Sequence, residues 1–285
     1  MTLRRLETRL PAQRAVEGDG FVVHRPFPVP GTEQVDPFLL LDQMGPVDHG
    51  PGEAVGTPVH PHRGFETVTY LLEGELQHRD SLGNEGTLGP GDTQWMTAGR
   101  GVLHEEGPTS GFLARGGRLH GLQLWVNLPA SAKMIPPAYQ DITADAVAVS
   151  HPSPGATVRV VAGEAFDLVG PGSTHTPITY THVTLEPGAQ VASAFDPNHT
   201  VLVFPLLGVV AVGDEVLATA ELGVLGPGDA VELSVPADAA SPSEILVLSG
   251  RPIGEPIARH GPFVMNTREE LVQAFADVRS PEFGS

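Results

Sequence analysis

The sequence contains no cysteine, and this absence excludes several kinds of chemistry at once. Disulfides, thiolate nucleophiles, iron–sulfur clusters and cysteine-ligated zinc all need a sulfur atom that the chain does not supply. Any metal bound by this protein must therefore be held by histidine, carboxylate or water ligands.

Basic residues are also scarce. The chain has 16 Lys and Arg against 34 Asp and Glu, a formal net charge of −18, and Lys133 is the only lysine. A surface this negative repels nucleic-acid phosphates, so direct nucleic-acid binding is not expected. No apolar run approaches the roughly 20 residues that a membrane span needs. The N-terminal residues lack the apolar segment of a secretory signal, so we expect a cytoplasmic protein that does not contact a membrane.

Glycine and proline are abundant, with 34 and 28 residues, which favours many short strands joined by tight turns. Residues 21–28 (FVVHRPFP) alternate like a strand. Residues 35–44 (VDPFLLLDQM) form an apolar run that periodicity alone cannot assign, and the flanking Pro and Gly favour a buried strand. Residues 117–127 (GRLHGLQLWVN) are the longest strand candidate. The sequence therefore predicts a mainly β protein.

The two ends of the chain differ from this pattern. Residues 1–20 are mixed and charged, which predicts an arm that packs late. Residues 266–279 (NTREELVQAFADVR) predict one helix, because Thr267 and Glu270 form a capping box and apolar residues recur at helical spacing. The last five residues, 281–285 (PEFGS), resemble a cloning scar, and we expect them to take no part in the fold.

Two short sequences recur in the second half of the chain. GTLGPGD (residues 86–92) returns as GVLGPGD (223–229), and YLLEG (70–74) is echoed by FPLLG (204–208). Two copies of one β-architecture are the natural interpretation. We therefore predict an N-terminal metal-binding domain over residues 1–137 and a C-terminal domain over residues 138–285. The candidate metal ligands described below all lie in the first copy. When the two copies are aligned, at most one of these ligands has a histidine at the matching position of the second copy, so we expect one metal per chain.

The candidate metal ligands come in two pairs. His60 and His62 are two residues apart, and so are His104 and Glu106, so each pair points to one face of a strand. Three imidazoles and one carboxylate can hold a metal ion with open coordination positions. Imidazole suits Fe, Zn, Cu or Ni, while a carboxylate and open positions suit iron or manganese redox chemistry.

Several nearby residues are rivals for these roles. Glu105 should point away from His104 and Glu106 if the segment is extended, and Glu66 is expected to support the ligands rather than bind the metal. His78 and His120 lie in alternating strands; they either line the cavity or have a solvent-facing or structural role, which we favour. A His-x-His pair by itself is a weak signal.

The surrounding motifs make a more specific case, because the chain resembles the pirin family of bicupins. The similar segments are HPHRGFETVTYLLEGE from His60, DSLGN from Asp80, GDTQWMTAGRGVLHEE from Gly91, HGLQLWVNLP from His120 and GPFVMNTREE from Gly261. The resemblance implies an all-β fold of two packed cupin (jelly-roll) β-barrels with a short C-terminal helix. It also implies a single Fe²⁺ in the N-terminal barrel, bound by His60, His62, His104 and Glu106. Other divalent metals, Mn, Ni, Co, Cu or Zn, fit the same donors.

The same resemblance implies two classes of function. Some pirins are quercetin 2,3-dioxygenases, which use O₂ to cleave a flavonol ring and release CO. The chain would then be an oxidoreductase, with Glu106 as catalytic base for the flavonol 3-hydroxyl. Others act as redox-sensitive protein partners of transcription factors or metabolic enzymes without catalysis. We expect a monomer in either case.

Overall fold

The computed structural model describes residues 1–280 and 283–284, and its regular structure is almost wholly β. The described residues contain 26 strands but only two α-helices, α1 (Ser110–Arg115) and α2 (Arg268–Asp277), with two 3₁₀ turns at η1 (Ala130–Ala132) and η2 (Ala144–Ala146). The expected all-β class with a C-terminal helix is therefore confirmed. In this described part, no helix is both long and apolar enough to cross a bilayer.

The chain divides into two compact units. The N-terminal barrel consists of Arg14–Arg25, Phe38–Ala144 and Ile253–Ser285, and the C-terminal barrel of Met1–Gln13, Pro26–Pro37 and Asp145–Pro252. Each end of the chain thus belongs to the unit that is built mainly from the other half of the sequence. The division predicted at residue 137 places each end of the chain in the domain formed by its own half of the sequence. In the structure, residues 1–13 belong to the C-terminal barrel and residues 253–285 to the N-terminal barrel.

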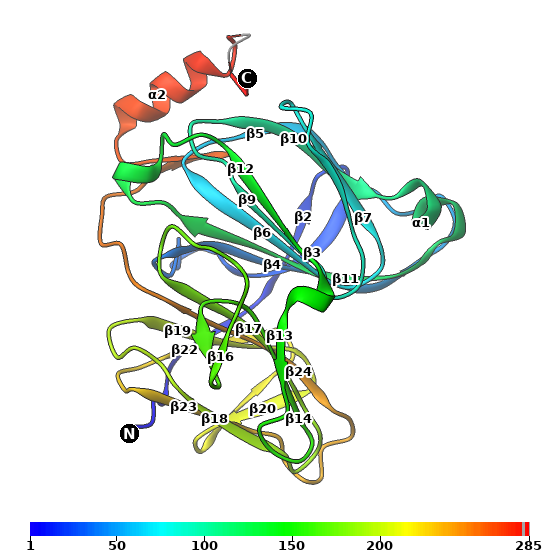
Figure 1. Ribbon diagram of the computed structural model, residues 1–285, viewed down its shortest axis with the longest axis vertical. Coiled ribbons are helices and arrows are strands. Elements are labelled where there is room, and N and C mark those ends of the chain that lie inside the picture. Colours follow the sequence, from blue (N-terminus) through cyan, green and yellow to red (C-terminus); the bar gives the residue numbers. More distant parts are fainter. Residues whose placement is uncertain (281–282, 285) are drawn as a thin grey trace. The chain divides into compact units, whose positions relative to one another are not determined.

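The N-terminal barrel is made of a seven-stranded and a four-stranded antiparallel sheet, with a two-stranded ribbon (Figure 1). The large sheet has the order β12 (Ala138–Ile142), β9 (Thr93–Thr97), β6 (Phe65–Glu73), β11 (Gly117–Asn127), β4 (Phe38–His49), β3 (Phe21–Phe27), β2 (Gln13–Glu17). The small sheet has the order β5 (Thr57–His62), β10 (Val102–Pro108), β7 (Leu76–Asp80), β8 (Glu85–Leu88), and the ribbon pairs β25 (Ala258–His260) with β26 (Phe263–Met265). The strands predicted at residues 21–28, 35–44 and 117–127 are all present.

The C-terminal barrel has the same composition of sheets. Its large sheet has the order β1 (Leu6–Pro11), β22 (Glu221–Leu225), β19 (Thr200–Leu207), β24 (Ser243–Gly250), β17 (Ile178–Leu185), β14 (Ala156–Ala162), β13 (Ala148–Ser150). Its small sheet has the order β18 (Gln190–Ala194), β23 (Ala230–Ser234), β20 (Val209–Val212), β21 (Glu215–Ala218), and a hairpin joins β15 (Glu164–Ala165) to β16 (Leu168–Val169). The residues expected to form a late-packing arm therefore include β1, an edge strand hydrogen-bonded to β22.

The matching strand orders confirm two copies of one architecture, with β5 to β11 corresponding to β18 to β24. YLLEG ends β6 and FPLLG ends β19, so that echo joins equivalent positions. The GPGD recurrence does not. Gly89–Asp92 connects β8 to β9, whereas Gly226–Asp229 connects β22 to β23, one strand later. A Gly-Pro-Gly-Asp turn suits many strand connections, so its recurrence does not show which strands of the two copies correspond.

The two barrels differ in what fills them. The C-terminal barrel encloses a large cluster of buried aliphatic side chains, including Val183, Val203 and Leu233. The N-terminal barrel has a smaller aliphatic cluster around Leu71 and Met44, and inward positions elsewhere carry histidines, acids and amides. The polar inner surface marks the N-terminal barrel as the place for chemistry.

Helix α2 (red in Figure 1) lies at the end of the N-terminal barrel where β5 and β10 also lie. Its capping box between Thr267 and Glu270 is present as predicted. Phe283 is 7% exposed and packs on Phe263, so the expectation that residues 281–285 take no part in the fold is wrong at this position. Residues 281, 282 and 285 lie outside the described part of the chain.

Candidate metal centre

Strands β5 and β10 bring the two predicted pairs together. They are antiparallel neighbours, with His104 opposite His60 and Val102 opposite His62. Because alternate residues on a strand share a face, the three imidazoles converge on one point. One nitrogen of each ring lies within 4.8 Å of the others, and the ring centroids are 4.4–4.9 Å apart.

Burial keeps these rings neutral. His62 and His104 are 4% and 1% exposed. Burial, reinforced by the neighbouring histidines, lowers the pKa of His62 well below its usual value, and burial lowers the pKa of His104 to about 4. Neither ring nitrogen of His104 has a hydrogen-bond partner among the described residues. Buried polar atoms left without partners are uncommon and call for an explanation, and a metal ion would provide one.

The spacing of the nitrogens fits a shared ion. Nε2 of His60 lies 2.9 Å from Nε2 of His62. Two imidazole nitrogens bound about 2.1 Å from one ion at adjacent octahedral positions would be about 3 Å apart. His60 also places Nδ1 2.8 Å from the carbonyl of Pro58, which fixes the protonated nitrogen and leaves Nε2 as the donor for a metal. The three-histidine set therefore fits a divalent metal.

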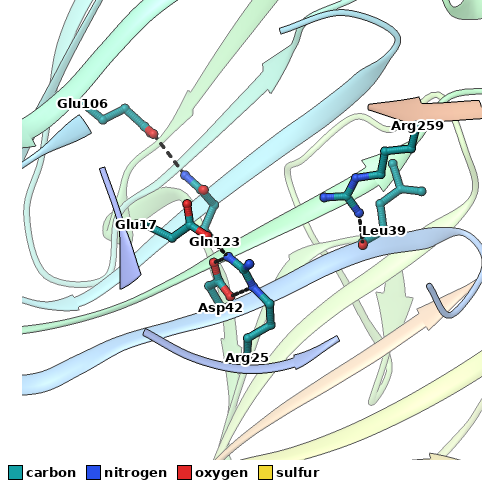
Figure 2. Close-up of polar contacts among 7 residues, drawn as sticks. All are labelled: Glu17, Arg25, Leu39, Asp42, Glu106, Gln123 and Arg259. Atoms are coloured by element: carbon teal, nitrogen blue, oxygen red, sulfur yellow. Dashed lines mark hydrogen bonds and ion pairs between the residues drawn. The ribbon is translucent and has the colours of Figure 1, made fainter. Parts of the chain in front are cut away.

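Glu106 is inside the same barrel but outside the histidine cluster. The β5–β10 ladder is irregular between His104 and Glu106. The Glu106 carboxylate accepts a hydrogen bond from Thr69 Oγ1 at 3.2 Å. It accepts a second from Gln123 Nε2 at 3.0 Å (Figure 2). The structure thus brings His60, His62 and His104 together and holds Glu106 beside them. Its role as the fourth ligand stays a prediction.

An ion pair lies next to Gln123 on the inner surface (Figure 2). Arg25 is hydrogen-bonded to Asp42, which is opposite Gln123 in the β4–β11 ladder, and to Glu17. Burial disfavours the charge on Arg25, but its bonds to Asp42 and Glu17 outweigh this and raise its pKa above the usual value. The barrel therefore has a compensated charge cluster beyond Gln123.

His78 also belongs to this polar interior. It is 4% exposed, stacks on Tyr139 with centroids 5.5 Å apart, and lies opposite Glu106 in the β7–β10 ladder. Burial lowers its pKa, and burial followed by the charge of Asp80 raises the pKa of Tyr139. His78 is therefore not solvent-facing; it lies in the interior of the barrel.

The rival residues lie elsewhere. Glu105 points outward, 3.7 Å from Arg79, and Glu66 is fully buried with a 2.7 Å hydrogen bond from Thr97 on β9. His120 is buried and lies 2.9 Å from the side-chain amide of Gln43, a structural contact.

A third set of contacts holds the loop after His62. The ammonium of Lys133, 1% exposed, donates to the carbonyls of Gly64 (2.8 Å) and Val264 (3.0 Å) and to Asn127 Oδ1 (2.7 Å). Burial lowers the pKa of Lys133 to about 8. Val264 is in β26, so the lysine ties the loop that follows His62 to the C-terminal segment (residues 261–277).

Arg63 makes the second connection. Its guanidinium donates to the carbonyl of Arg100 (2.6 Å) and to Asp277 of α2 (2.7 Å), and Gly64 N–H donates to the Gly99 carbonyl (2.8 Å). Arg100 and Gly99 precede the strand that carries His104. The loops next to both ligand pairs are therefore bonded to each other and to the C-terminal segment.

Thr69, Gln123 and Trp125 also belong to the site, although they were not among the residues predicted from the sequence. The ring centroid of Trp125 lies 5.2 Å from that of His62, and Gln123 and Trp125 alternate inward along β11. Alternation along HGLQLWVN was a usable signal, since an amide and an indole on one face of a central strand suggest a polar cavity.

Fold and site together define a two-barrel cupin protein with a group of three histidines in one barrel that could hold a metal ion. Two family models match the chain: Pirin over residues 20–126 and the Pirin C-terminal cupin domain over residues 180–284. The chain belongs to the pirin family.

Individual relatives agree with this assignment. A Pseudomonas aeruginosa protein named "Putative quercetin 2,3-dioxygenase" is 45% identical, with 95% of both chains covered. Human pirin is 41% identical, covering 94% of this chain and 90% of its own. A crystal structure of quercetin 2,3-dioxygenase from Acinetobacter baumannii has a TM-score of 0.92 and 38% identity, with 99% of each chain covered.

Proposed function

We propose that the protein is an iron-dependent flavonol 2,3-dioxygenase that cleaves quercetin or a similar flavonol. The observation that carries this proposal is the cluster of three histidines beside a carboxylate held by Thr69 and Gln123. The names of the similar Pseudomonas and Acinetobacter proteins support the choice of substrate class.

Each of these residues has a separate role in the proposed reaction. Glu106 accepts the proton of the flavonol 3-hydroxyl on a carboxylate oxygen, because a general base must lie within hydrogen-bond reach of that proton. Gln123 and Thr69 donate to the same carboxylate and fix its orientation. His60, His62 and His104 would hold the ion, which supplies Lewis acidity and a common template for flavonol and O₂. The aromatic rings of Trp125 and Phe65 pack against the imidazole of His62. Both oxygen atoms of O₂ enter the cleaved product, a depside, and CO leaves.

The test is turnover by protein reconstituted with iron under anaerobic conditions. Adding quercetin and O₂ should bleach the near-ultraviolet band of quercetin and release one CO per O₂ consumed. His104→Ala should abolish turnover together with metal binding, while His151→Ala, a change at an exposed histidine of the C-terminal barrel, should leave both unchanged. Absence of turnover with each of Fe, Mn, Ni, Co and Cu would refute the proposal.

A second candidate is a metal-dependent regulator that binds a protein partner. The excess of 18 negative charges supports it, because such a surface attracts basic partners. In that case the oxidation state of the metal would change partner affinity without turnover. Ferrous and ferric protein that capture the same weak background from a lysate would argue against this function.

A further inference from the structure

The C-terminal barrel has a cavity of about 1220 Å³ that the proposed dioxygenase chemistry does not use. It lies beside the β18–β23 ladder, which corresponds to the ladder that carries the histidines in the N-terminal barrel. In the second copy, the inward pair on this ladder is Ser193 and Val231. Neither of these side chains is a usual ligand of a transition metal, so the second copy lacks the histidine set of the first.

The walls of this cavity are largely apolar and partly aromatic. Phe166, Leu168, Phe195 and Ile178 all line it. Phe166 and Asp167 form the tip of the β15–β16 hairpin, and both have positive φ, 53° and 59°. Positive φ at both central residues is what a two-residue type I′ hairpin turn requires. The backbone N–H of Phe166 donates to Ser193 Oγ at 2.8 Å, which holds the hairpin tip against β18.

One end of the cavity is polar. His199 Nδ1 lies 3.2 Å from Ser249 Oγ, and its Nε2 lies 3.8 Å from Asp196 Oδ2. Ser249 is 1% exposed, so this group is built into the wall. Burial lowers the pKa of His199, so its ring is neutral near pH 7 and offers one donor and one acceptor.

The order Asp196, His199, Ser249 resembles a catalytic triad, but its geometry does not support acyl transfer. The gap of 3.8 Å between Asp196 and His199 is too long for a hydrogen bond. Ser249 lies within the central strand β24 and is nearly inaccessible, whereas a nucleophile must reach its substrate. His199 and Asp196 are better suited to recognising hydroxyl groups.

We propose that this cavity binds a neutral, hydroxylated aromatic molecule. Its rings would lie against Phe166 and Phe195, and its hydroxyls would bond with His199 and Asp196. The lining also contains Glu164 and Asp167, and three acids around one cavity disfavour an anionic ligand. Apolar walls with a few convergent polar groups are typical of small-molecule sites.

The experiment uses the full chain with the metal centre removed by His60→Ala and His104→Ala, so that binding in the N-terminal barrel and failure of the dioxygenase proposal do not affect it. Isothermal titration with quercetin should show one saturable site per chain, and titration with benzoate, an anionic aromatic, should show at least tenfold weaker binding. Ala194→Trp, at an exposed position on the cavity lining, should weaken quercetin binding at least tenfold by filling the cavity.

Two further variants separate recognition from folding. His199→Ala should weaken quercetin binding about tenfold without changing the melting temperature by more than His151→Ala does. His151 is exposed in the same barrel and does not line the cavity, so its variant should bind quercetin normally. The proposal is overturned if quercetin gives no saturable binding, if benzoate binds equally well, or if Ala194→Trp leaves the affinity unchanged.

Discussion

Glu106 keeps its carboxylate between donors from two other strands, Thr69 on β6 and Gln123 on β11. When a half-buried carboxylate loses a hydrogen-bond donor, its desolvation is no longer offset, and this typically costs about 1–3 kcal/mol. The side chain would then turn towards another partner. The position of this carboxylate therefore depends on side chains of two other strands.

Gln123→Leu tests this dependence. We expect kcat for flavonol cleavage to fall about 10-fold to 100-fold while metal content stays at one per chain, because the change alters the base and not the imidazoles. Gln77→Leu, on the exposed face of β7, is the matched control and should behave like the wild type. Equal losses of kcat in both variants would contradict the role assigned to Gln123.

The neutral histidines make the metal-free protein sensitive to acid. The pKa of His104 is about 4 in the folded chain, against an unperturbed value of about 6.5. Between these values the unfolded chain binds more protons than the folded chain, so the free energy of unfolding falls as the pH falls from 6.5 towards 4. His104 alone can account for up to roughly 3 kcal/mol.

Urea midpoints of the metal-free protein at pH 7.5, 5.5 and 4.5 measure this loss. His104→Gln should show a shallower decrease than the wild type, because glutamine does not titrate. Bound iron should also be released on dialysis at pH 5, since protons compete for the same nitrogens. Parallel decreases in the two proteins, or full iron retention at pH 5, would refute the assignment.

Gly64 offers a separate test of the loop after His62. Its φ is +88°, and a Cβ atom there would lie 2.0 Å from the backbone oxygen of Val264. Gly83 has a similar φ of +86° but open space around it. Gly64→Ala should therefore lower the free energy of unfolding by about 2–4 kcal/mol and Gly83→Ala by about 1 kcal/mol. Thermal denaturation compares them, and equal effects would show that the close approach to Val264 is unimportant.

At the scale of elements, the C-terminal segment contacts the loops next to the candidate metal centre without supplying a ligand. Lys133 and Arg63 connect β26 and α2 to the loops that follow His62 and precede His104. Ligands that are held in place by surrounding contacts lose less entropy on binding a metal. The segment should therefore slow metal release although none of its residues is a ligand.

Asp277→Asn removes the ion pair with Arg63 and should speed metal loss to a chelator several-fold. Lys133→Met, which leaves three buried oxygen acceptors without their ammonium, should have a larger effect. Glu269→Gln, an exposed change in the same helix, is the control. Unchanged release rates in both test variants would show that the segment is only scaffolding.

Sequence patterns predicted elements well where the signal is local. The capping box of Thr267 and Glu270 and the alternation in β11 each depend on a few neighbouring residues. The pairing of His60 with His104 followed from strand geometry and the family motif. The donors to Glu106 come from two other strands, and although alternation in β11 pointed to Gln123, no local pattern shows that Gln123 or Thr69 would meet Glu106. Phe283 was misjudged because a terminal aromatic residue reveals nothing of the pocket it fills.

For the molecule as a whole, the two barrels should respond differently to metal. Both tryptophans, Trp95 and Trp125, belong to the N-terminal barrel, so their fluorescence reports on that unit. Removing the metal should lower the midpoint of the fluorescence-detected transition by several degrees. The part of the circular-dichroism transition that comes from the C-terminal barrel should move less. Coincident shifts by both probes would show that the barrels unfold as one unit.

The division of the whole chain was harder to predict than its class. Composition and turns indicated β-structure, and two copies were expected. The GPGD recurrence suggested the wrong register, because turn chemistry is shared by unrelated connections. The exchange of the chain ends has no composition signal, since β1 is an edge strand of ordinary sequence.

That exchange has a consequence for synthesis on the ribosome. The N-terminal barrel includes Ile253–Ser285, so it stays incomplete until the whole C-terminal barrel has been translated, although most of its residues emerge first. The C-terminal barrel needs Met1–Gln13, and β1 must wait for more than two hundred residues before its partner strand β22 exists. Domains usually fold one after another as they emerge. Here the nascent chain has to keep both ends available, and two genes cut between residues 144 and 145 should not yield two independently folding proteins.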